Sequence, residues 1–252
     1  MKKTMATIAA LMMAASGFAQ LTGSEVMKKV YELPTGTDQQ GQLTMTLVHK
    51  SGEKRVRSLQ QFSKKTDMEE KKVMFFLAPA DVRGTSFMNW SYSDGRDDDQ
   101  WIYLPALKRS KRLSSDSKSD AFMGSDFTYD DLGERHPSKD QHTLLREERV
   151  GQTMCYVIQS KPVNPKDTYS KTISWVVKDV YVGLKKEFYD QDGRLLKVLS
   201  VKKYDKIDGY WTILETEMHN VQKQHKTEMK FEHVQYDQGI PDSKFTERGM
   251  TI

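Results

Sequence analysis

The sequence predicts a mainly β protein, built as a continuous antiparallel meander within one domain. Two observations predict it: runs of residues that alternate apolar and polar side chains with a period of two, and Gly-containing turn pairs between the runs. The clearest run is Lys226–Tyr236, in which Thr227, Met229 and Phe231 alternate with charged residues. Further runs are Leu43–Val48, Lys72–Leu77, Ser86–Tyr92, Gln100–Leu104, Thr153–Ile158, Thr172–Val177, Leu195–Val201 and Tyr210–Met218. An antiparallel sheet tolerates one wet face, which this alternation indicates.

The turn pairs place Gly where a tight hairpin needs a positive φ. They are Ser51-Gly52, Asp94-Gly95, Asp192-Gly193 and Asp208-Gly209. Helical spacing occurs in Gly23–Leu33, where Val26 and Val30 recur on one face, Ser24 is the expected N-cap and Pro34 ends the run. A second short helix is expected near the C-terminus, from Ile240 to Phe245.

The first 19 residues have the pattern of a secretory signal peptide. Lys2 and Lys3 precede an apolar run, Ala6–Ala15, and small residues lead to Ala19, so we expect cleavage before Gln20. The apolar run is only about ten residues, short of the roughly 20 that span a bilayer. We therefore expect an exported periplasmic protein with one domain over residues 20–252.

Composition excludes several classes of protein. The net charge of +4 falls to +2 once Lys2 and Lys3 are removed, which gives no reason to expect nucleic-acid binding. The single cysteine, Cys155, is expected to be a buried, inert thiol, so no internal disulfide can form. Because no cysteine stands at the expected cleavage point, we expect no lipid anchor on the N-terminus. We expect a monomer.

The sequence contains no motif typical of an enzyme or a cofactor site: G-x-S-x-G, G-x-G-x-x-G and the P-loop are all missing, so we expect neither catalysis nor a cofactor. His219, His225 and His233 should spread along a hairpin as surface side chains rather than converge on a metal. Asp97-Asp98-Asp99 could bind calcium, but a solvated hairpin tip is the favoured interpretation.

A basic run follows the Gln100–Leu104 strand. Its members, Lys108, Arg109, Lys111 and Arg112, could contact anionic lipid head groups or an acidic partner surface. The alternative is an edge strand protected by charge, which β proteins use to prevent edge-to-edge pairing.

Aromatic side chains give the strongest indication of function. Met88, Trp90 and Tyr92 share one face of a predicted strand, and Trp101 and Tyr103 share one face of the next. These residues could form an ordinary core. However, the long loop Ser110–Leu132 carries Phe122, Met123 and Phe127 with almost no local pattern to bury them. We therefore predict that the strand residues line a hydrophobic cavity and that the three loop residues close over it as a lid.

Two strings carry a resemblance to a known family. The first is Trp101-Ile102-Tyr103-Leu104-Pro105-Ala106-Leu107, and the second is Phe122-Met123-Gly124-Ser125-Asp126-Phe127-Thr128-Tyr129-Asp130-Asp131-Leu132. With them the chain resembles the outer membrane lipoprotein-sorting family, in the LolA-like branch of the LolA and LolB superfamily. The resemblance extends over nearly the whole mature chain.

The resemblance implies a curved antiparallel sheet that forms an incomplete, half-open β-barrel, with short helices capping its concave face and a hydrophobic cavity there. It also implies a periplasmic chaperone that carries lipid or lipoprotein acyl chains toward the outer membrane. In the best-known carrier an arginine on a barrel strand holds the lid shut. No motif assigns that role to Arg55, Arg57 or Arg83.

Two other functions remain open at this stage. This branch often occurs beside inner-membrane exporters of the resistance-nodulation-division (RND) type, so the chain could be an accessory module that docks there without carrying lipid. A hydrolase with two dispersed carboxylates is the other alternative, although no pair of carboxylates is singled out.

Overall fold

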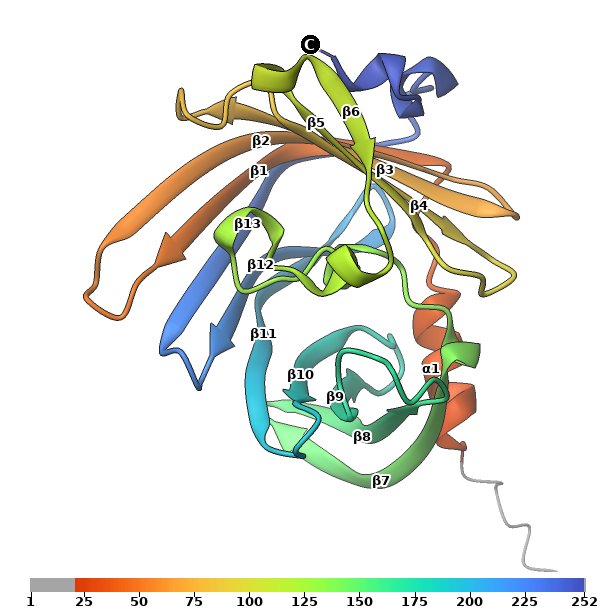
Figure 1. Ribbon diagram of the computed structural model, residues 1–252. Helices are drawn as coiled ribbons and strands as arrows, with labels where there is room; N and C mark the ends of the chain where they lie inside the picture. The colour runs from red at the N-terminus through yellow and green to blue at the C-terminus, as the bar shows by residue number, and fades with distance from the viewer. Residues whose placement is uncertain (1–20, 252) are drawn as a thin grey trace, which may run out of the picture.

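The computed structural model describes residues 21–251. Their fold is a single antiparallel sheet of 13 strands that does not close into a barrel, as Figure 1 shows. The strands are β1 (Asp38–Val48), β2 (Lys54–Lys65), β3 (Glu69–Ala78), β4 (Ser86–Tyr92), β5 (Asp99–Leu104), β6 (Arg109–Arg112), β7 (Asp140–Val150), β8 (Thr153–Pro162), β9 (Lys171–Val177), β10 (Gly183–Tyr189), β11 (Leu195–Ile207), β12 (Tyr210–Asn220) and β13 (His225–Tyr236). The predicted fold class, a half-open antiparallel barrel, is confirmed.

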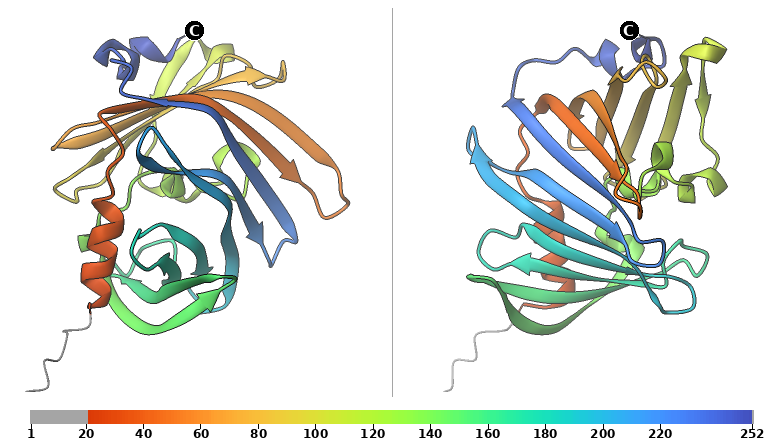
Figure 2. Two further views of the ribbon diagram at one scale, coloured as in Figure 1. Left: turned by 180° about the vertical axis from the view of Figure 1, so that it is seen from behind. Right: turned by 90° about the vertical axis from the view of Figure 1, so that its left-hand side faces the viewer.

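The order of the strands explains why one loop must cross the molecule. The sheet runs β6-β5-β4-β3-β2-β1-β13-β12-β11-β10-β9-β8-β7, so the chain builds outward from β1 to one edge and inward from the other edge to β13. Strands β1 and β13 pair in the middle of the sheet. The connection from β6 to β7, residues 113–139, therefore joins opposite edges, and we call it the crossing segment. Figures 1 and 2 show it passing along the hollow side of the curved sheet.

Short helical turns occur within and around the crossing segment. They are η1 (Pro105–Leu107), η2 (Asp116–Ser119), η3 (Phe122–Gly124), η4 (Asp130–Leu132) and η5 (Pro137–Lys139), followed near the C-terminus by η6 (Asp242–Phe245) and η7 (Arg248–Met250). The turns of the crossing segment, η2 to η5, supply the short helices that were expected on the concave side. The turn η6 lies within the range of the short helix expected near the C-terminus.

The N-terminal helix α1 (Gly23–Tyr31) packs on the β7–β9 end of the sheet. Its N-cap is Thr22 rather than the predicted Ser24, because Thr22 and Glu25 form a reciprocal capping box. Val26 packs with Ile158 on the concave face. A side chain on Gly23 would lie 2.7 Å from the backbone nitrogen of Leu144, so this close approach requires glycine.

Alternation sends neighbouring residues of β3 and β4 to opposite sides, and both sides are buried. Phe76 and Phe87 face the concave side, while Phe75 and Met88 face the convex side. The convex side is covered by the C-terminal segment, residues 237–251, through Ile240, Phe245 and Met250. The buried Asp38 carboxylate anchors this segment by accepting hydrogen bonds from three successive backbone amides, those of residues 238–240, at 2.8–2.9 Å.

The predicted strands are confirmed, with bounds that extend by a few residues. Strands β2, β7 and β10 were not predicted, because their surfaces carry too many charges for a clear period of two. The Asp208-Gly209 hairpin has positive φ at both residues, 50° and 91°, as a tight turn requires. Cys155 is buried, as expected. The predicted signal peptide lies outside the described residues.

Candidate functional site

The concave face of the sheet is apolar, and the crossing segment covers it. Phe122, Phe127 and Leu132 of the segment are buried against side chains of the central strands. The sheet side chains of this cluster are Leu43, Met45, Leu47, Leu59, Met74, Phe76, Phe87, Phe188 and Met218. The lid residues predicted from the sequence therefore do lie over an apolar sheet face.

Phe122 is the most deeply inserted residue of the crossing segment. Its ring centroid lies 5.3 Å from that of Phe87 and 5.9 Å from that of Phe76, and Tyr129 of the same segment packs edge-on at 5.5 Å. Aromatic pairs at these separations are favourable beyond the area that they bury. The segment thus covers the sheet with a small aromatic cluster of its own.

Arg57 joins the sheet to the crossing segment beside this cluster. Its guanidinium donates a hydrogen bond to the carbonyl oxygen of Met123, which has a positive φ of 49°. The same guanidinium lies 5.9 Å from the centre of the Phe76 ring. Arg55 instead pairs with Glu53, and Arg83 donates to the Leu77 carbonyl. Of the three arginines left open by the sequence, Arg57 is the one that contacts the crossing segment.

Two buried carboxylates fix the middle of the crossing segment. Asp126 accepts a hydrogen bond from Thr227 Oγ1 at 2.7 Å, and its Oδ2 lies 2.7 Å from His225 Nδ1. Asp131 pairs with Lys197 Nζ at 2.5 Å. Because His225 is mostly buried in this contact, the prediction of a surface histidine is wrong at this position.

Polar residues hold the segment at the β4–β5 end. Gln100 donates to the Tyr129 carbonyl at 2.8 Å. Asp98 is buried and accepts from Ser91 at 2.6 Å and from Asn89 at 3.1 Å. The prediction of a solvated hairpin tip is therefore wrong for Asp98, because its carboxylate points inward and accepts these hydrogen bonds.

Two small cavities remain between the crossing segment and the sheet. One of about 210 Å³ lies toward β8–β12, and one of about 240 Å³ lies toward β1, β3, β12 and β13. Asp131 and Gly133 border both. The segment therefore divides the concave space and fills its centre.

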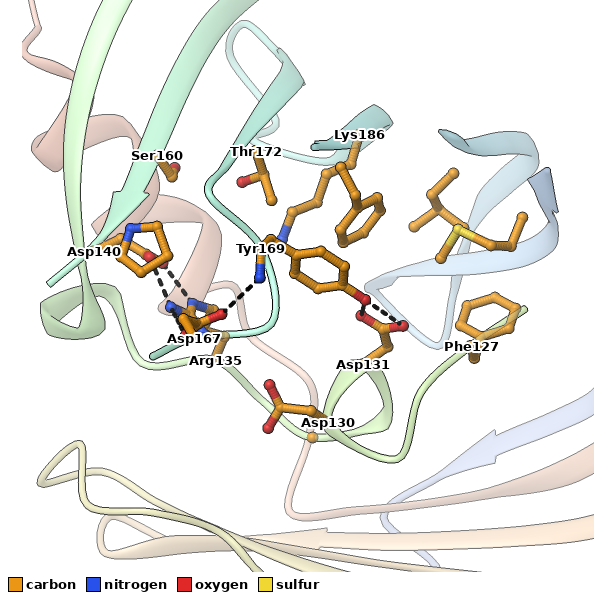
Figure 3. Close-up of a pocket in the computed structure, with 15 residues that line it drawn as sticks. Phe127, Asp130, Asp131, Arg135, Asp140, Ser160, Asp167, Tyr169, Thr172 and Lys186 are labelled. Carbon is orange, nitrogen blue, oxygen red and sulfur yellow. Dashed lines mark hydrogen bonds and ion pairs between the residues drawn. The ribbon is translucent and has the colours of Figure 1, made fainter. Parts of the chain in front are cut away.

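The first cavity, drawn in Figure 3, combines ion pairs with an apolar wall. Arg135 binds Asp140 through two hydrogen bonds of 2.6 and 2.7 Å and reaches Asp167 at 2.9 Å. Tyr169 donates its hydroxyl to Asp131 at 3.0 Å. Burial raises the pKa of the Asp130 carboxyl. The cavity thus holds a dense set of charges away from bulk water.

The aromatic strand residues predicted to line the cavity lie on the other face of the sheet. The C-terminal segment packs against four of them, Met88, Trp90, Trp101 and Tyr103. Tyr92 shares the face of β4 that carries Ser86, whose hydroxyl donates to the Met250 carbonyl of that segment. Their predicted place beneath the lid is wrong. The predicted residues do share one face of each strand, but the face toward the crossing segment is that of Phe87, Asn89 and Gln100.

The basic run forms the edge of the sheet, as the alternative interpretation held. Arg109, Lys111 and Arg112 are exposed in β6, and Arg112 pairs with Asp99. Lys108 makes the turn before it with a φ of 48°. The contact of this run with head groups or a partner stays a prediction.

Within residues 21–251, no group of three or more His, Cys, Asp or Glu side chains is placed to hold a metal ion. Over the same part of the chain, no helix has the length and apolar character needed to cross a membrane.

Comparison with known proteins identifies the family. A family model described as that of an uncharacterized protein matches residues 68–251. A DUF1329 family protein from Desulfovibrio piger is 30% identical, has a TM-score of 0.86 and aligns over 91% of this chain and 98% of its own. The chain belongs to the DUF1329 family.

Other solved structures place this DUF1329 protein near the lipoprotein-sorting fold. A Vibrio parahaemolyticus domain named for outer membrane lipoprotein sorting is 33% identical, with a TM-score of 0.86 over 90% of this chain and 97% of its own. The LolA superfamily protein NE2245 from Nitrosomonas europaea, at 21% identity and a TM-score of 0.71 over 91% and 100%, shares the fold. The predicted LolA-like resemblance is confirmed. No curated protein matches the sequence.

Proposed function

We propose that this DUF1329 protein is a non-catalytic periplasmic carrier that binds lipid or lipoprotein acyl chains on its concave face and moves them toward the outer membrane. One observation carries the proposal: the apolar concave face is covered by a segment that contributes no strand to the sheet there. Such a cover can leave without breaking the strand pairing beneath it. Phe122, Met123 and Phe127 would then be the lid residues.

The energetics of acyl chains favour a closed carrier. Each methylene transferred to water costs about 0.8 kcal/mol, so a chain of sixteen carbons costs on the order of 12 kcal/mol. The cavities of about 210 and 240 Å³ are smaller than the roughly 300–1,000 Å³ typical of ligand sites. An acyl chain therefore takes the place of Phe122 and Phe127, and these residues shield the sheet when no cargo is bound.

The likeness to the Vibrio parahaemolyticus sorting domain supports the cargo class, and the predicted signal peptide supports the periplasm. No observation favours docking on an RND-type exporter as the main function.

Two experiments test the proposal: binding of a fluorescent fatty acid, and native mass spectrometry of protein purified from membranes. We expect co-purified lipid and saturable probe binding. The Arg57→Gln variant removes one charged hydrogen bond from the closed state, about 1–2 kcal/mol. Because the open state becomes more populated, apparent probe affinity should rise by about 5- to 30-fold.

Arg55→Gln is the matched control, since Arg55 lies two residues earlier on β2 and pairs with the exposed Glu53. It should leave probe affinity unchanged. Protein that is always empty and binds no probe, with or without Arg57, would rule out a carrier.

A further inference from the structure

Lys186 of β10 points into the cavity between the crossing segment and β8–β12. Figure 3 shows its side chain running toward the space beside Thr172 and Tyr169. Within residues 21–251, its ammonium has neither a hydrogen-bond acceptor nor a carboxylate in ion-pair range, and it lies 5.1 Å from the Phe188 ring centre. Lys186 is half-buried, and its amino group reaches this cavity without a direct counterion.

Four carboxylates lie around Lys186, those of Asp130, Asp131, Asp140 and Asp167, and all but that of Asp130 are engaged with other partners. Asp140 and Asp167 both bind Arg135. Asp131 is held by Lys197, by the Tyr169 hydroxyl and by the backbone amide of Thr128. These carboxylates act on Lys186 only at longer range, so none of them neutralises it by contact.

Removing an ammonium from bulk water without giving it a partner is costly to the fold. Burial lowers the pKa of Lys186, while the nearby charge of Asp131 opposes that shift. An apolar side chain of similar length, such as Met, would avoid this cost. Perturbed ionisable groups in a cavity tend to mark functional sites.

The cavity also offers an apolar wall beside the ammonium. Phe188, Leu199 and Met218 of the sheet line it, and Phe127 closes it from the crossing segment. Its volume of about 210 Å³ far exceeds the roughly 10–15 Å³ that one water requires. Movement of the crossing segment would join this space to the apolar concave face, since Phe127 belongs to both.

We propose that Lys186 binds the anionic head group of an acyl ligand, a carboxylate or a phosphate, whose chain lies on the concave face. This inference rests on the proposed function and specifies its ligand as an anionic amphiphile. The bound anion provides the negative counterion that Lys186 does not have within the protein. The apolar wall receives the first carbons of the chain.

Calorimetric titration with three ligands of equal chain length tests this inference. Dodecanoate carries a carboxylate, dodecyl phosphate carries a phosphate and dodecanol is uncharged. For the wild-type protein we expect at least one of the anions to bind about tenfold more tightly than dodecanol. The stronger of the two anions identifies the head-group chemistry.

Lys186→Met should remove this preference and leave dodecanol affinity unchanged, whereas Lys186→Arg should keep it. Lys185→Met is the matched control, because Lys185 lies on the opposite face of β10 and contacts Glu187 at 2.6 Å. It should bind all three ligands as the wild type does.

An undiminished preference for the anions in Lys186→Met would overturn the inference. Equal affinity of the wild-type protein for all three ligands would also overturn it, and this measurement needs no variant. That result would leave the proposed carrier function intact. If no ligand binds at all, both the inference and the carrier function fail.

Discussion

Glu134 lies near the end of the crossing segment, where Lys65 Nζ reaches its carboxylate at 3.0 Å. Burial, and then the negative charge of Glu70, raise the pKa of Glu134 to about 7. In the unfolded chain the same carboxyl ionises near its ordinary value of 4.5. The folded protein therefore binds more protons than the unfolded chain between these two values. Stability falls as the pH rises through this window.

We expect Glu134→Gln to remove this loss. Between pH 5 and pH 8 the free energy of unfolding should fall by about 1–2 kcal/mol more in the wild type than in the variant. Urea unfolding at the two pH values measures the difference. Glu32→Gln is the control, because Glu32 is exposed and pairs only with Lys28 on the surface. An identical pH dependence in wild type and Glu134→Gln would contradict this account.

Several decisive side chains on the concave face could not be predicted from the sequence. Arg57 and Lys186 stand in strands where alternating charge indicates a solvent-exposed face, whereas His225 shares the alternation of the apolar Met229 and Phe231. They face inward because the crossing segment brings a carbonyl, a cavity and a carboxylate to them. Phe122, Met123 and Phe127 were found from the sequence, because no local alternation explained their apolar side chains.

At the scale of elements, the crossing segment and the sheet have different roles in stability. Phe122 and Phe87 are both fully buried and face each other. Phe87 belongs to β4, which pairs with β3 on one side and β5 on the other, whereas Phe122 belongs to a segment with no partner strand in that sheet. Local opening can relieve a defect in the segment without global unfolding.

We therefore expect unequal costs from the same truncation. Phe87→Ala should lower the free energy of global unfolding by about 3–5 kcal/mol, the usual range for a buried aromatic. Phe122→Ala should lower it by less than half of that and should speed amide exchange in the crossing segment. Denaturant unfolding and hydrogen exchange measure the two effects. Equal losses of global stability would show that the segment is a permanent part of the core.

At the scale of the whole molecule, the sheet separates the concave face, where we propose that ligand binds, from a convex face that contributes to stability. On the convex face Phe245 is buried, and Lys244 lies 4.2 Å from the centre of the Phe62 ring beside it. The concave face is covered by the crossing segment and retains cavities. The two covers come from different parts of the chain and lie on opposite sides of the sheet (Figure 2).

Phe245→Ala tests this separation. It should lower the free energy of unfolding by about 3–5 kcal/mol because it empties a fully packed site. Affinity for a fluorescent fatty acid should stay within about twofold of the wild type, or about 0.4 kcal/mol in binding free energy, at a temperature where both proteins are folded. A large loss of affinity would indicate that the aromatic residues of the convex face take part in ligand binding.

The sequence by itself determined the strand alternation, the hairpin turns, the family and the presence of an apolar loop over the sheet. Each of these depends on residues close together in the chain. Only the tertiary structure decided which face of β4 and β5 meets that loop. Alternation assigns Phe87 and Met88 to opposite sides, but it cannot say which side is concave. In this protein both sides are buried, one by the crossing segment and one by the C-terminal segment, so hydrophobicity alone could not distinguish them.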